Sequence, residues 1–235
     1  MNTKKHQITV SGIHVEVVRK AIKNMHLTVY PPNGRVRITV PMSVTDEAVR
    51  LAVVRKLGWI KRQQARFESQ PSQSQREMVT GESHYFLGHC YRLHIIEHNG
   101  PGTVLPRSNA HLDVFVRSGA TVEQRERVLQ KWYREQLRAL IPPLIEKWES
   151  IIDVQVAEWR IKRMKTRWGS CNIRAGRIWL SLELATKPLQ CLEYVVVHEM
   201  AHLRERRHDK RFIALMDEVL PAWRLHKAEL NAAPR

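Results

Sequence analysis

The chain has 235 residues, of which 43% are hydrophobic and 26% are charged, and these are the proportions of a soluble globular protein. No apolar run approaches the roughly 20 residues that cross a bilayer, so we expect no membrane-spanning segment and no membrane partner. No apolar stretch follows the basic residues Lys4 and Lys5, so we expect no signal peptide. Three widely spaced cysteines exclude a disulfide framework and a zinc ribbon and favour a reducing cytoplasm. They are Cys90, Cys171 and Cys191.

The formal net charge is +16, and the sequence pI is about 10.3. Up to Arg117 the chain has 17 Lys and Arg against 8 Asp and Glu, and after it 22 against 15. The positive charge is therefore spread over the body of the protein. Such a body attracts the phosphates of nucleic acids without regard to base sequence. No nucleic-acid-binding motif accompanies the charge, so a basic protein without a nucleic-acid partner is an equal alternative.

The first 117 residues are predicted to be rich in β-strands. Alternating apolar residues over 7–41 predict strands, with a hairpin at the Pro-Pro-Asn-Gly turn. A helix follows from Ser43 or Thr45, and the polar stretch 70–75 predicts a loop. A second hairpin is centred on Gly88, and 110–116 predict one more strand. We therefore expect a β-rich N-terminal subdomain over 1–117 with one helix.

The helix of this subdomain has an apolar stripe that predicts its core-facing side. The stripe consists of Val49, Val53, Leu57 and Ile60. Its opposite side is basic, which is typical of a solvated helix face.

Several histidines lie near the second hairpin, namely His84, His89, His94 and His98. Spacings of five residues put successive side chains on opposite faces of a strand, so we expect no metal site there.

Residues 118–235 are predicted to form a second subdomain. A capping box from Thr121 to Gln124 begins a long helix, which Pro142 and Pro143 break or kink. A basic stretch over 159–171 then leads into the strict alternation of 177–184, and together they predict a β-hairpin with one buried side. Ser181 falls on the outward side of that alternation. Thr186 and Pro188 mark the start of the next helix.

That helix carries His198, Glu199 and His202. Its two histidines lie four residues apart, one turn apart on the same face, so both imidazoles can bind one metal ion. Glu199 lies beside the open position of such an ion. This is the H-E-x-x-H arrangement of zinc-dependent hydrolases, in which the glutamate takes a proton from a zinc-activated water. The opposite side of the helix is apolar and predicts a buried back formed by Leu192, Val196, Met200 and Leu203.

A catalytic zinc usually has three protein ligands, so a third is needed. His208 would lie on the wrong face of a continuous helix, and it can bind only if the helix ends within 204–207 and the chain turns back. Metzincins have the same histidine spacing with a glycine at the turn, where this chain has Glu205. We favour His208. The alternatives are Glu218, on a helix predicted over 210–219, and His226.

These motifs together resemble the YgjP-like metallopeptidase family, which is akin to the SprT-like and WLM zinc proteases. They are Arg-Trp-Gly-Ser-Cys at 167–171, the strand at 178–184, the His198 segment at 194–203, His208 with Phe212, and Leu-Pro-Ala-Trp at 220–223. The β-rich first half also resembles the family, so the match covers roughly residues 15–223. The resemblance implies a zincin-like fold, with His198, His202 and His208 as metal ligands and Glu199 as catalytic base. SprT-like relatives that act on DNA-bound proteins often carry DNA-binding or zinc-ribbon parts, and this chain has no cysteine ribbon.

We therefore expect an α+β protein whose β-rich first half precedes a zincin-like half made of a β-hairpin and the H-E-x-x-H helix. The expected enzyme is a zinc metallopeptidase with one Zn²⁺ per chain and a peptide or protein substrate. Arg167 is a candidate oxyanion or substrate residue. The edge of the hairpin is a candidate docking place for an extended substrate.

Two other functions remain open. The first is a nucleic-acid-associated protein, in which the metal site serves DNA-linked proteolysis or only structure. Its phosphate contacts would come from Lys162, Arg163, Lys165, Arg167, Arg204, Arg206, Arg207, Lys210 and Arg211. The second is a scaffold stabilised by a metal but without activity, which a closed site with four protein ligands would favour.

Overall fold

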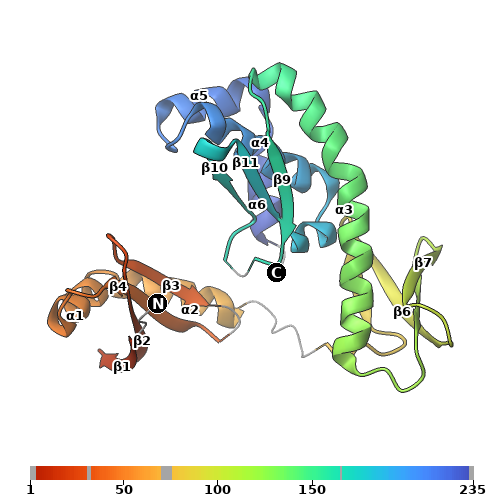
Figure 1. The fold of residues 1–235 in the computed structure, drawn as a ribbon, viewed down its shortest axis with the longest axis horizontal. Helices are drawn as coiled ribbons and strands as arrows, with labels where there is room; N and C mark the ends of the chain where they lie inside the picture. Colours follow the sequence, from red (N-terminus) through yellow and green to blue (C-terminus); the bar gives the residue numbers. More distant parts are fainter. Residues whose placement is uncertain (1–3, 31–32, 70–75, 165, 233–235) are drawn as a thin grey trace. The chain divides into compact units, whose positions relative to one another are not determined.

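The computed structural model describes residues 4–30, 33–69, 76–164 and 166–232. The chain has the expected α+β fold (Figure 1). Its contacts divide it into two compact units, Met1–Ser74 and Gln75–Arg235. This division falls well before the boundary at 117 that the sequence suggested. The predicted loop over 70–75 lies outside the described residues.

The first unit is a four-stranded sheet with two helices. Its strands are β1 (Lys4–Val10), β2 (Ile13–Lys20), β3 (His26–Tyr30) and β4 (Arg35–Pro41), in the order β1-β2-β4-β3. β2 and β4 pair in parallel, and the other neighbours are antiparallel. The predicted hairpin is confirmed, since Tyr30 of β3 lies opposite Arg35 of β4. Alternate residues such as Val15, Val17 and Ile38 are buried on one face.

The predicted single helix of this unit is two helices, α1 (Asp46–Arg55) and α2 (Leu57–Ser69). Thr45 caps α1, because its side chain accepts a hydrogen bond from the N–H of Ala48. α1 stops at Lys56, whose N–H donates to the carbonyls of Val53 and Val54. The expected apolar stripe still faces the core, since Val49, Val53 and Ile60 are fully buried.

The second unit begins with another four-stranded sheet. Its strands are β5 (Ser83–Phe86), β6 (His89–Glu97), β7 (Thr103–Ser108) and β8 (His111–Val116), in the order β5-β6-β8-β7. The hairpin at Gly88 and the strand β8 are confirmed. The sequence did not predict β7, because it contains Pro106 and polar neighbours instead of alternating apolar residues. As an edge strand, β7 tolerates a proline.

This sheet shares its core with the C-terminal part of the chain, which explains the position of the boundary. Leu93, Val104 and Leu112 belong to the same buried cluster as Leu129 and Trp132 of the long helix α3 (Val122–Ile152). The expected division at 117 separated a sheet from the helix that covers it, because the sequence does not reveal which elements pack together.

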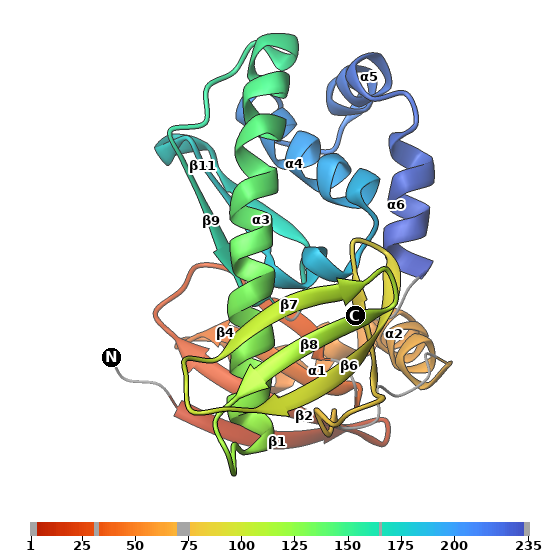
Figure 2. The same ribbon diagram turned by 90° about the vertical axis from the view of Figure 1, so that its right-hand side faces the viewer.

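Helix α3 connects the two parts of the second unit. The predicted capping box is present, since Thr121 and Gln124 bond reciprocally. The helix continues through Pro142 and Pro143 without a break, and its upper half bends in Figure 1. Figure 2 shows it running from the β5–β8 sheet to the side of α4 (Leu189–Arg204).

The other part of the unit is a three-stranded sheet followed by three helices. The strands are β9 (Glu158–Lys162), β10 (Gly169–Asn172) and β11 (Arg177–Ser181), in the order β10-β11-β9. A 3-10 turn, η1 (Ile173–Ala175), joins β10 to β11 in the predicted hairpin, and β9 pairs with β11 in parallel. β10 is therefore an edge strand.

The alternation that began in β11 ends earlier than predicted. Leu182 and Leu184 are buried as expected, but they lie in the 3-10 helix η2 (Leu182–Thr186). Ser181 was predicted to face outward, and this was wrong, because its side chain is fully buried. The strand ends at Ser181, and its N–H donates to the carbonyl of Trp168 in the segment that enters β10.

Helix α4 lies at the centre of this part. It contacts α3, β10, β11 and the two last helices, α5 (Lys210–Val219) and α6 (Trp223–Ala232). Its predicted start after Pro188 and the predicted extent of α5 are confirmed. In the described part of the chain, no helix is both long and apolar enough to cross a membrane.

Candidate metal centre

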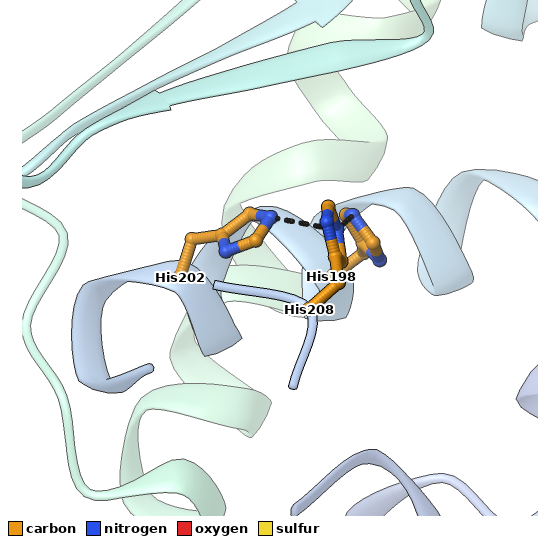
Figure 3. Close-up of side chains that lie close together, drawn as sticks. All are labelled: His198, His202 and His208. Atoms are coloured by element: carbon orange, nitrogen blue, oxygen red, sulfur yellow. Dashed lines mark hydrogen bonds between the residues drawn. The ribbon is translucent and has the colours of Figure 1, made fainter. Parts of the chain in front are cut away.

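Three imidazole rings converge at the end of α4 (Figure 3). The Nε2 atom of His208 lies 3.0 Å from Nε2 of His198 and 3.1 Å from Nε2 of His202. One ligand atom of each ring lies within 4.8 Å of the others. Nitrogen ligands at about 2.0–2.1 Å from a tetrahedral zinc ion are separated by about 3.3 Å. The two separations from His208 are close to this value, and the third is at most 4.8 Å, so the three rings can converge on one ion.

The chain turn that brings His208 back needs no glycine. Helix α4 ends at Arg204, and Glu205 then takes an extended conformation with φ −122°. Any residue adopts such a backbone, which explains why Glu205 replaces the glycine of the metzincin turn. Asp209 then caps α5 by accepting hydrogen bonds from the N–H groups of Arg211 and Phe212. His208 is thus held between the end of one helix and the start of the next.

One of the rings has a fixed tautomer. The carbonyl oxygen of Glu205 lies 3.1 Å from Nδ1 of His202 and can only accept a hydrogen bond. Nδ1 of His202 therefore carries the proton, and its Nε2 presents a lone pair to the other rings. Metal-binding histidines are commonly oriented in this way through their second nitrogen. Nδ1 of His198 is buried and has no hydrogen-bond partner among the described residues.

Phe212 supports all three rings from α5. Its ring centroid lies 5.0 Å from that of His198, 4.7 Å from that of His202 and 4.8 Å from that of His208. The side chain of Phe212 is almost completely buried. An apolar residue at this place restricts the rings to one arrangement, and the sequence had identified it only as part of a motif.

Two of the three histidines, His198 and His208, have lowered pKa values. The pKa of His198 is lowered to about 3, first by burial and then by the neighbouring His202, His208 and Lys227. Burial and the same kind of neighbours also lower the pKa of His208. A neutral imidazole is the form that binds a metal ion.

Glu199 lies between α4 and the edge strand β10. It is only 6% exposed, and its carboxyl group packs directly on the backbone of Gly169. A Cβ atom at position 169 would lie 2.6 Å from Oε1 of Glu199. Burial raises the pKa of Glu199 to about 8, and the positive charge of Arg167 opposes this rise. The sequence gave Gly169 no role of its own, because the contact joins residues thirty positions apart.

The chain matches the model of a known protein family. A model of the YgjP-like metallopeptidase domain matches residues 23–233. The chain belongs to the YgjP-like metallopeptidase family. A comparison with solved structures finds the crystal structure of the metallopeptidase zymogen of Pyrococcus abyssi abylysin, with 21% identity and a TM-score of 0.37. The match covers 39% of this chain and 92% of that chain. No curated protein matches the chain.

The structure separates the other candidates from the histidine cluster of this YgjP-like chain. Among the described residues, the group that could hold a metal consists of His198, His202 and His208 and includes neither Glu218 nor His226. Glu218 is exposed on α5. The histidines of the β5–β6 region also lie outside the group. Arg167 is exposed just before β10 and influences Glu199 through its charge.

Proposed function

We propose that this member of the YgjP-like family is a zinc metallopeptidase that hydrolyses peptide bonds. His198, His202 and His208 are the proposed ligands of one zinc ion, and Glu199 is the proposed general base. The observation that carries the proposal is the convergence of three imidazole nitrogens, one from each histidine, within 4.8 Å of one another beside a buried glutamate. Membership in a metallopeptidase family supports the same reaction class.

A bound zinc ion supplies a Lewis acid that lowers the pKa of water to about 7 and polarises a peptide carbonyl. Glu199 accepts a proton from the attacking water and transfers it to the leaving amine. For this role the carboxyl must be ionised, and the positive charge of Arg167 favours ionisation against the effect of burial. We propose Arg167 as the cation that stabilises negative charge on the substrate carbonyl.

The edge strand β10 is the proposed docking place for the substrate backbone. Among the described strands β10 pairs with β11 alone, and the other edge of β10 is the proposed place for an extended peptide. Gly169 of this strand touches Glu199. A peptide added beside β10 would therefore pass close to the proposed base.

Elemental analysis of the purified protein tests the metal and its third ligand together. We expect about one zinc per chain, as for a single three-histidine site. His208→Ala should lose the zinc, whereas Glu218→Ala should keep it. Loss of zinc in the Glu218 variant alone would contradict the assignment of His208.

A nucleic-acid partner is a second proposal, and the position of the charge favours it. Residues 1–74 have 13 Lys and Arg against 4 Asp and Glu, whereas 75–117 have four of each. The positive excess of the N-terminal part thus lies within the first compact unit. Fluorescence anisotropy with labelled DNA at two salt concentrations tests this idea, because phosphate contacts weaken steeply with salt. Absence of binding even at low salt removes it.

The proposed location is the cytoplasm. Cys90, Cys171 and Cys191 are all free thiols, as is usual for proteins of a reducing compartment. Fractionation of cells that express the protein tests this location, and recovery outside the cytoplasmic fraction would contradict it.

A further inference from the structure

Lys227 of α6 is a cation beside the histidine cluster that the proposed mechanism does not use. Its positive charge lowers the pKa of both His198 and His208. Arg167 acts instead on Glu199, from the segment before β10. Two cations from separate elements, Lys227 of α6 and Arg167 before β10, therefore act on the site. Of these two, only Arg167 has a role in the proposed reaction.

A row of aromatic rings links Lys227 to the cluster. The ring of Tyr194 lies 5.7 Å from that of His198, one turn away on α4. Trp223 stacks on Tyr194 at 6.4 Å with an interplanar angle of 12°. Nζ of Lys227 then lies 5.3 Å from the centroid of Trp223. The ammonium group thus rests on an aromatic platform that is continuous with a proposed metal ligand.

Helix α5 holds Trp223 of this aromatic platform in place. Nε1 of Trp223 donates a hydrogen bond of 2.7 Å to Oδ1 of Asp217, and Trp223 is only 8% exposed. Lys227 itself is exposed to solvent. Its stem therefore lies on a rigid surface while its charged end reaches solvent beside the site.

The ammonium of Lys227 is available to a ligand. Among the described residues, no carboxylate forms an ion pair with it within 4.0 Å, while neighbouring acids have other partners. Asp217 binds Arg224 and Trp223, and Glu229 accepts hydrogen bonds from Gln190.

We propose that Lys227 binds a carboxylate of the substrate, so that the enzyme prefers peptides with an acidic group near the cleaved bond. This inference rests on the proposed peptidase function and names its substrate class. Carboxylates are the anionic groups of an unmodified peptide, and they occur on Asp and Glu side chains and at the C-terminus. An exposed ammonium attracts either group modestly and repels a lysine or arginine at the same place. The selectivity should therefore be a preference among substrates and not an absolute requirement.

Binding without turnover gives the sharpest test. Zinc-loaded Glu199→Gln protein is titrated into three fluorescein-labelled peptides at low salt, and anisotropy is measured. The first peptide contains one Glu and a free C-terminus, the second has Gln in place of Glu, and the third has a C-terminal amide. We expect about two- to fivefold tighter binding of the peptide that retains the recognised carboxylate, the range for an exposed ion pair. Weaker binding of the peptide with Gln shows that the recognised carboxylate is the Glu side chain. Weaker binding of the peptide with a C-terminal amide shows that it is the C-terminus.

Charge variants at position 227 identify the residue responsible. In the Glu199→Gln protein, the additional change Lys227→Met should remove the preference for the acidic peptide. Lys227→Glu should reverse this preference towards a peptide with Lys in place of Glu. Lys131→Glu is the matched control, because it makes the same charge change at an exposed site on α3. The proposal is overturned if the parent protein shows no preference, or if the position 227 variants behave like the control.

Hydrolysis by the zinc-loaded protein with Glu199 intact separates this inference from the function on which it rests. Lys227→Met should raise KM for the acidic peptide and leave kcat unchanged. If hydrolysis does not depend on the residue at position 227, the proposed carboxylate site is contradicted and the proposed peptidase function is retained. If binding depends on Lys227 but no peptide is hydrolysed, the carboxylate site is retained and the peptidase function is contradicted.

Discussion

Replacing Gly169 by alanine tests whether the edge strand β10 positions the proposed base. The new Cβ would lie 2.6 Å from Oε1, 2.7 Å from Cγ and 2.9 Å from Cδ of Glu199. Carbon atoms in contact are about 3.5–4.0 Å apart, so the carboxyl group or the strand must move by about 1 Å. Because Glu199 is buried, the displacement is confined to the space between α4 and β10.

A misplacement of this size near reacting atoms costs about 10²-fold in rate. Overpacking of a buried site also lowers the free energy of unfolding by about 1–3 kcal/mol. The assay measures kcat/KM on a fluorogenic peptide, zinc content and urea unfolding of the same preparation. We expect Gly169→Ala to lose about two orders of magnitude in kcat/KM while it keeps its zinc.

Ser170→Ala is the control. Ser170 is the next residue on β10, so its side chain points to the face of the sheet opposite to that of a side chain at position 169. This variant should retain nearly full activity. Full activity of Gly169→Ala would refute the reasoning. Equal loss of zinc and activity would also refute it, because the effect would then arise at the metal site and not at the base.

Two further perturbations probe the same site. Phe212→Ala should lower the free energy of unfolding by about 3–5 kcal/mol and weaken zinc binding, because Phe212 packs on all three histidine rings; zinc affinity equal to that of the parent would contradict its supporting role. In the metal-free protein, the raised pKa of Glu199 means that its carboxyl keeps a proton in the folded state at pH values where the unfolded state loses it. The contribution of Glu199 to the free energy of unfolding therefore declines as pH rises from about 4.5 to about 8. Glu199→Gln should remove this decline in urea unfolding at a series of pH values, and an unchanged pH profile would contradict it.

Local patterns of the sequence were sufficient to predict many of the elements. The capping box at Thr121, the hairpin at Gly88 and the helix over 210–219 depend on residues close together in the chain, and the structure confirms them. The face shared by His198 and His202 follows from helical periodicity alone. Such features need no knowledge of the packing between elements.

Features that depend on packing were missed or misplaced. The parallel pairing of β9 with β11 joins segments whose order in the sheet no local pattern encodes. Ser181 is fully buried at the end of β11, where its backbone bonds to Trp168 of the segment before β10. The contact-based division after Ser74 differs from the sequence-based boundary at 117, since Leu93 and Leu112 belong to the same buried cluster as α3.

The environment of the site was also beyond the sequence. The absence of a glycine at Glu205 was the main difficulty for His208, and an extended backbone at that residue resolves it. Gly169 and Lys227 come from β10 and α6, which only the folded chain brings to α4. A spacing rule identifies ligands on one helix, but it does not identify the residues that surround them.

The central claim is that Glu199 acts on water at a zinc ion held by the three histidines. Its most direct test measures zinc content and peptide hydrolysis together in Glu199→Gln and His202→Ala. The account predicts that Glu199→Gln keeps about one zinc per chain but loses hydrolysis, and that His202→Ala loses both. Full hydrolysis by the Glu199→Gln variant would contradict the account.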